Sequence, residues 1–131
     1  MILTLSALQA LWQNSPDASR LHTAIMRSPV RAVSSATVVE AAMALLAERM
    51  GGSDLELDAL LRELDAVVVP VSETQSHRAR EAARTYGPGR HVASLTLGDC
   101  LAYALAVELG EPLLAVGTDG LARTDIERVS F

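Results

Sequence analysis

Residues 95–106 read LTLGDCLAYALA, and this stretch predicts an apolar helix with one carboxylate, Asp99, close to its start. Leucines recur at every fourth position and predict one buried face. They are Leu97, Leu101, Leu105 and Leu109. Thr96 lies three residues before Asp99, which is the spacing of a capping box. Asp99 is therefore a helix cap, or it is a ligand that carboxylates from elsewhere in the chain join.

Composition limits the classes of function. The 131 residues correspond to a single domain, residues 1–131, that is long enough to bury a core without disulfides. Cys100 is the lone cysteine, so an internal disulfide is excluded, which fits the reducing cytoplasm. We expect Cys100 to be a small core residue. A formal net charge of −5 gives no general attraction to nucleic acid, so any such contact must be local. We expect neither a signal peptide nor a membrane span.

Short apolar runs alternate with helical patterns along the chain. Strands are predicted at residues 1–5, 30–33, 66–71 and 112–116, with a weak fifth strand at 128–130. Helices are predicted between them, the first from Ser6 and the second from about Pro16 behind a Ser15 cap. This alternation predicts an α/β domain of three layers, α/β/α, around a mostly parallel central sheet of four to five strands.

A third helix is predicted from Ser35 to about Gly51-Gly52, with Glu40 in its first turns. Its expected inward face follows helical spacing and comprises Val39, Ala42, Met43 and Leu46.

Four polar residues follow strand ends or lie in the helices after them: Thr4, Glu40, Asp99 and Asp119. Ligands of parallel sheets gather at the carboxyl ends of the strands, so we expect these residues to converge there. Each acid also has a simpler interpretation. Glu40 would be a solvated helix acid, and Asp119 would be an ordinary turn residue between glycines.

Several motifs, in this order, resemble the PIN-domain ribonucleases and most closely the VapC-type toxins of toxin–antitoxin pairs. They are residues 4–8 (TLSAL), Glu40, residues 86–91 (YGPGRH), residues 96–100 (TLGDC), residues 117–120 (GTDG) and residues 124–126 (TDI). The similarity covers nearly the whole chain.

The resemblance implies a metal-dependent endoribonuclease of PIN fold that acts on RNA, is silenced by a VapB-type antitoxin and forms a homodimer. It makes Asp99 a direct ligand of Mg²⁺ or Mn²⁺, and it makes Glu40 and Asp119 direct or water-bridged ligands. Carboxylate oxygens suit these cations. The antitoxin is expected in an apolar groove between the early helices. The surface around Leu8, Leu11 and Trp12 would form that groove or the dimer contact.

The chain departs from the family at its first acid, where Thr4 stands in place of an Asp. The loss removes one formal charge and predicts weaker metal affinity. Ser6 would contact a ligating carboxylate or cap the first helix. The alternative function is a catalytically degenerate PIN-domain module that still binds an antitoxin or RNA. A flavodoxin-like nucleotide-binding domain is disfavoured, because no glycine-rich loop follows the first strand.

Arginines gather in one region of this acidic chain, between residues 78 and 90. Arg84 and Arg90 are the predicted contacts to the RNA backbone. The simpler interpretation is a solvated helix face.

Overall fold

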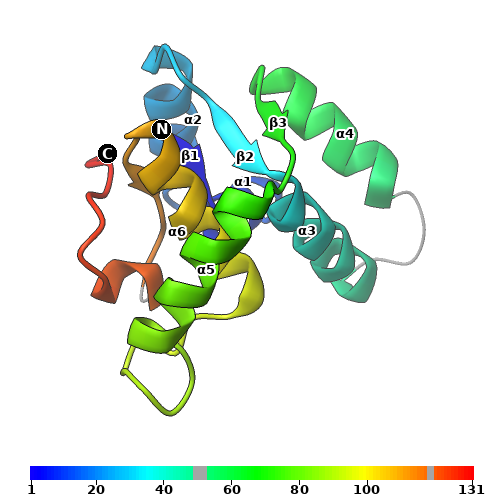
Figure 1. The fold of residues 1–131 in the computed structure, drawn as a ribbon. Helices are drawn as coiled ribbons and strands as arrows, with labels where there is room; N and C mark the ends of the chain where they lie inside the picture. Colours follow the sequence, from blue (N-terminus) through cyan, green and yellow to red (C-terminus); the bar gives the residue numbers. More distant parts are fainter. Residues whose placement is uncertain (49–52, 118–119) are drawn as a thin grey trace.

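The sheet at the centre of the computed structural model is parallel throughout (Figure 1). The structure describes residues 1–48, 53–117 and 120–131. Within them, the strands are β1 (Ile2–Leu3), β2 (Ala32–Ser34), β3 (Val67–Val69) and β4 (Leu113–Leu114), in the spatial order β3-β2-β1-β4. In place of the weak fifth strand there is one isolated bridge between Leu113 and Arg128.

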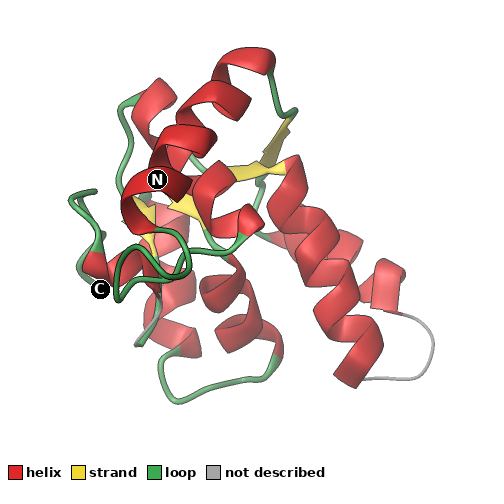
Figure 2. Ribbon diagram, turned by 60° about the horizontal axis from the view of Figure 1, so that its bottom comes forward, coloured by secondary structure: helices red, strands yellow, loops and turns green. Residues whose placement is uncertain are grey.

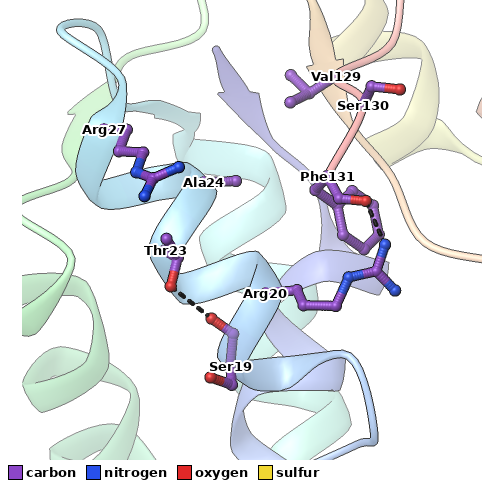
Figure 3. Close-up of a pocket in the computed structure, with 8 residues that line it drawn as sticks. All are labelled: Ser19, Arg20, Thr23, Ala24, Arg27, Val129, Ser130 and Phe131. Atoms are coloured by element: carbon purple, nitrogen blue, oxygen red, sulfur yellow. Dashed lines mark hydrogen bonds between the residues drawn. The ribbon is translucent and has the colours of Figure 1, made fainter.

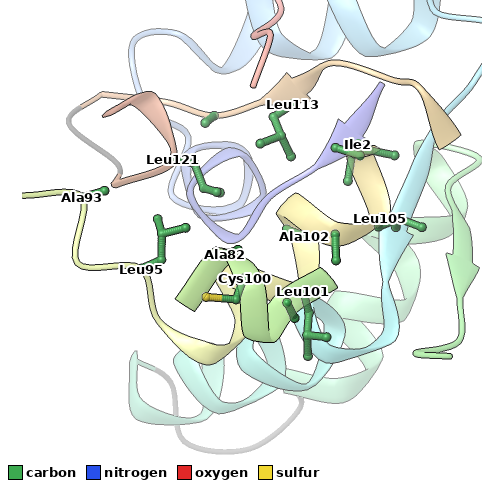
Figure 4. Close-up of a cluster of buried hydrophobic side chains, with 14 of the residues drawn as sticks. Ile2, Ala82, Ala93, Leu95, Cys100, Leu101, Ala102, Leu105, Leu113 and Leu121 are labelled. Atoms are coloured by element: carbon green, nitrogen blue, oxygen red, sulfur yellow. The ribbon is translucent and has the colours of Figure 1, made fainter. Parts of the chain in front are cut away.

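One face of the sheet is covered by α5 (Glu73–Tyr86), α6 (Leu97–Leu109) and the short 3-10 helix η1 (Gly120–Arg123). Ile2 and Leu113 point to this face and pack with the apolar side of α6 (Figure 4). Leu101 and Leu105 are buried there as predicted, whereas Leu97 and Leu109, at the two ends of the helix, are 78% and 44% exposed. The predicted apolar face is therefore correct in the middle of α6 and wrong at its ends.

The opposite face is covered by α1 (Leu5–Trp12), α2 (Ala18–Arg27), α3 (Ser35–Glu48) and α4 (Ser53–Glu63). Successive strand residues point to opposite faces, so Leu3, Val33 and Leu114 belong to this second core. Helices thus enclose the strands from both sides (Figure 2), and the predicted three-layer α/β/α architecture is confirmed. None of the described helices is long and apolar enough to cross a membrane.

The first two helices begin at other residues than predicted. Leu5 belongs to α1 and not to the first strand, because the Thr4 side chain already caps the helix. The second helix, α2, begins at Ala18, and Ser15 is not its cap.

The third helix, α3, faces the core with another side than predicted. Its buried residues are Thr37, Ala41 and Leu45. Three of the residues predicted to face inward, Val39, Met43 and Leu46, are 60%, 68% and 65% exposed. The helix is apolar nearly all round, so spacing alone could not select the face that meets the sheet. Its predicted end at Gly51-Gly52 lies outside the described residues.

Candidate active site

Glu40, on α3, reaches the first turn of α6, the helix that carries Asp99. The Glu40 carboxyl group lies directly against the backbone of Gly98, in the first turn of α6. A methyl group built on Gly98 would be 1.5 Å from Glu40 Oε1, 2.1 Å from Cδ and 2.6 Å from Oε2. Asp99 is the next residue of the same turn. The structure therefore brings Glu40 to the helix start that carries Asp99.

Asp99 forms the capping box predicted from its spacing to Thr96. Its Oδ2 accepts a hydrogen bond from the Thr96 backbone amide at 3.0 Å, and its own amide donates to Thr96 Oγ1 at 3.2 Å. The cap fixes the orientation of the carboxylate at the positive end of the helix dipole. Capping is compatible with a second role, because a carboxylate has about four lone-pair sites.

Thr4, at the position of the missing family acid, is 1% exposed, and its hydroxyl is fully engaged. Oγ1 donates to the Leu114 carbonyl at 2.7 Å and accepts from the Ala7 amide at 3.4 Å. Ser6 Oγ lies 3.0 Å away and donates to it, because the only proton of Thr4 points at Leu114. One donor and two acceptor sites complete the capacity of a hydroxyl. Thr4 is thus a helix cap and a tie to β4, and it has no capacity left for a metal or a water.

Ser6 links α1 to the segment that follows β4. Besides donating to Thr4, its hydroxyl accepts from the Val116 backbone amide at 3.1 Å. The alternative prediction that Ser6 caps the first helix is wrong, because Thr4 is the cap. Its contact to a ligating carboxylate stays a prediction.

Asp119, the third predicted acid, lies outside the described residues. Among the residues that are described, no group of three or more His, Cys, Asp or Glu side chains could hold a metal ion. The described residues contribute the pair Glu40 and Asp99. Their oxygen donors fit a hard cation such as Mg²⁺ or Mn²⁺ and do not suit a soft one.

Comparison with known proteins shows the family. The PIN domain matches residues 5–127 of the chain. Ribonuclease VapC30 of Mycobacterium tuberculosis is 39% identical over 131 residues, which are 100% of this chain and 99% of the relative. Ribonuclease VapC of Mycolicibacterium smegmatis is 39% identical over 129 residues, 98% of this chain and 99% of that protein. This chain belongs to the VapC ribonucleases of the PIN-domain family.

The fold agrees with this assignment. The chain superposes on the crystal structure of the Mycobacterium tuberculosis toxin VapC20, a sarcin–ricin loop cleaving toxin, with a TM-score of 0.75 at 16% identity. The match covers 98% of this chain and 97% of VapC20. The resemblance inferred from the motifs is confirmed, and with it the PIN fold and membership of a nuclease family.

Cys100 follows Asp99 in this PIN domain and lies within the core on the α6 face of the sheet (Figure 4). Burial, together with the charge of Asp99, raises the pKa of its thiol. A nucleophilic cysteine needs a lowered pKa. The prediction of a small core residue is confirmed.

Arg84 and Arg90, the predicted RNA contacts, are exposed, on α5 and on the loop that follows it. Neither forms an ion pair within the part of the chain that the structure describes. Both guanidinium groups are thus available to phosphate.

A cluster around Tyr103 is the feature that the sequence predictions missed. The Tyr103 hydroxyl donates to Asp125 Oδ1 at 2.7 Å, and the Asp125 amide donates to the Tyr86 hydroxyl at 3.3 Å. The Tyr103 hydroxyl, and then that of Tyr86, lowers the pKa of Asp125. Tyr103 follows Asp99 by four residues, so it lies on the same side of α6. The spacing of four residues could therefore have placed Tyr103 on the Asp99 side of the helix from the sequence alone.

Two hollows of the surface are lined by residues other than Glu40 and Asp99. One hollow, of about 460 Å³, lies between α2 and the C-terminal segment, where the Arg20 guanidinium sits over the Phe131 ring (Figure 3). A more apolar hollow, of about 490 Å³, lies between α5 and α6 and reaches Thr96 and Leu97. Glu40 and Asp99 thus lie outside these two hollows, at the junction of α3 and α6.

Proposed function

We propose that this PIN domain is an endoribonuclease toxin of VapC type that uses Asp99, Glu40 and Asp119 to hold Mg²⁺ or Mn²⁺. The observation that carries the proposal is the packing of the Glu40 carboxyl group against Gly98, next to Asp99. Two acids from separate helices are thereby held at one junction, close to the carboxyl end of the sheet.

A divalent cation bound by these acids would supply an activated water and a countercharge for the scissile phosphate. The side chains of the protein fix where this happens. The Thr96 amide orients Asp99, and the packing of Glu40 on α6 limits its freedom to turn into solvent. Ser6 donates toward position 4, which supports its predicted contact to a carboxylate in relatives that carry an acid there.

RNA is the proposed substrate, although the net charge of the chain is −5. Arg84 and Arg90 supply local positive charge on one side of the molecule, and phosphate contacts of this kind account for most non-specific affinity. The substrate would therefore bind through its backbone next to the acids.

A VapB-type antitoxin and a second copy of this chain are the proposed partners, on the basis of the family. The expected surface around Leu8 needs correction, because Leu8 is fully buried. Leu11 and Trp12 are half-buried, and the Trp12 indole donates to Glu48 at 2.9 Å. The exposed apolar side of α3 is a further surface of the kind that a protein partner needs. We place the protein in the cytoplasm, because a lone buried cysteine fits a reducing compartment.

The test is cleavage of a mixed RNA pool by antitoxin-free protein in Mn²⁺ or Mg²⁺, with and without EDTA. Asp99→Asn is the matched variant, because an amide oxygen still accepts from the Thr96 amide while the charge is lost. Cutting that EDTA stops and that Asp99→Asn lacks supports the proposal. A folded protein that cuts nothing in either metal would contradict it and favour the binding module.

A further inference from the structure

Gly98 is buried in the first turn of α6, at a position where a glycine needs an explanation. Glycine inside a helix costs about 1 kcal/mol relative to alanine. Its usual compensation is a left-handed backbone, as at Gly110, where φ is +63° and the helix ends. Gly98 has ordinary helical geometry and no positive φ. The backbone conformation therefore does not account for it.

The lack of room for a side chain accounts for the glycine at position 98. The three atoms nearest to a methyl group built on Gly98 all belong to the Glu40 carboxyl group, at 1.5, 2.1 and 2.6 Å. Carbon–oxygen contacts this short do not occur between non-bonded atoms. Any side chain at position 98 would therefore overlap the carboxyl group where it now lies.

The displaced group would be the acid and not the helix. Glu40 reaches α6 with the far end of a flexible side chain, whereas residue 98 is held within a hydrogen-bonded turn. A rotation of the Glu40 side chain would relieve the overlap, and that rotation moves the carboxylate out of its place against the Gly98 backbone, in the turn that carries Asp99. A methyl group here would thus leave the fold intact and remove one acid from the pair.

We propose that Gly98 is a positioning residue that reserves the space in which the Glu40 carboxylate lies beside Asp99. The inference rests on the proposed function, because it takes Glu40 to be a metal ligand. It adds that the acid pair is set by the absence of a side chain on the facing helix.

The test measures Mn²⁺ affinity by titration, without RNA, in Gly98→Ala, Glu40→Gln, Glu40→Asp and the double variant Glu40→Asp/Gly98→Ala. Gly98→Ala should lower the affinity about 10- to 100-fold, the usual effect of losing a group that orients a ligand. It should match Glu40→Gln. Its melting temperature should equal or exceed that of the parent, because alanine is the better helix former.

The Glu40→Asp variant tests whether Gly98→Ala acts through its overlap with the carboxyl group of residue 40. Aspartate is shorter by one carbon–carbon bond, about 1.5 Å, so its carboxylate withdraws from the space that the new methyl group would fill. Gly98→Ala should then change the affinity by no more than about twofold relative to Glu40→Asp alone.

The outcomes distinguish the two proposals. If Glu40→Gln binds Mn²⁺ as the parent does, the metal role of Glu40 is wrong and the inference about Gly98 is overturned with it. If Glu40→Gln loses affinity while Gly98→Ala keeps it, the proposed function stands and only Gly98 loses its role. An equal loss from Gly98→Ala in both backgrounds would also overturn the inference, because the effect would not depend on the length of residue 40.

Discussion

Replacing Thr4 by aspartate should make the stability of the domain depend on a divalent cation. The new carboxylate would still accept from the Ala7 amide and the Ser6 hydroxyl, so the cap of α1 is preserved. It cannot donate to the Leu114 carbonyl, to which Thr4 now donates at 2.7 Å. Two acceptors would then face each other at a position that is 1% exposed.

That one bond sets the minimum loss, because desolvation of the new charge adds to it. Leaving a buried acceptor without its donor costs about 1–3 kcal/mol. For a domain of this size, about 2 kcal/mol lowers the melting temperature by about 5–10 °C. Mn²⁺ stabilises the parent too, but an aspartate variant that binds it about 100-fold more tightly gains about 2.7 kcal/mol over the parent in excess Mn²⁺. Bound cation should therefore offset the loss of that bond.

Thermal unfolding in EDTA and in Mn²⁺ measures both effects, with Thr4→Val as the control. Valine loses the same bond to Leu114 and supplies no ligand, so its melting temperature should fall in both solutions. The aspartate variant should fall in EDTA alone and should cut RNA faster than the parent. An aspartate variant that Mn²⁺ fails to rescue would refute the reasoning, since position 4 would then not reach the cation.

Three further predictions test other parts of the molecule. Reversing the charge of Arg84 and Arg90 together should weaken RNA binding and lower the slope of log affinity against log salt by about 1.4; an unchanged slope would make them a solvated face. Because the pKa of Asp125 is lowered in the folded protein, ionised Asp125 stabilises the fold above the pKa of the unfolded carboxyl, and this stabilisation is lost as pH falls from about 5 toward 2. Tyr103→Phe should flatten that fall in urea unfolding at pH 7 and pH 3, and an identical fall would contradict the role of the hydroxyl. Met43→Gln should change the free energy of unfolding by less than about 0.5 kcal/mol, whereas a loss of several kcal/mol would mean that this side of α3 is buried.

The architecture could be predicted from the sequence because strands and helices alternate, and short parallel strands require helical crossovers. The orientation of α3 could not. Thr37, Ala41 and Leu45 form the buried stripe, while Val39 and Met43 form an equally regular apolar stripe that is exposed. Which stripe meets the sheet depends on packing between elements distant in the chain, and a hydrophobic period carries no information about it.

The candidate site likewise has one part that the sequence predicts and one part that it does not. The spacing of Thr96 and Asp99 is local, so the capping box was predictable. The contact between Glu40 and Gly98 joins residues that are far apart in sequence, and only the fold brings them together. From sequence alone, a glycine in an apolar helix is only a weak helix former. The fold shows that the missing side chain of Gly98 leaves room for the Glu40 carboxylate.

Thr4 shows why a substitution at a site position need not damage the fold. Position 4 has a structural task, to cap α1 and to meet the Leu114 carbonyl, and threonine performs both parts of it with one hydroxyl. An ionised aspartate performs only the capping part, because it has no proton to donate to the Leu114 carbonyl. The threonine therefore suits the metal-free fold better than the family acid would, and the stability of the parent protein carries no information about its activity. Metal affinity and RNA cleavage must be measured directly, and the response of the aspartate variant to Mn²⁺ connects the two.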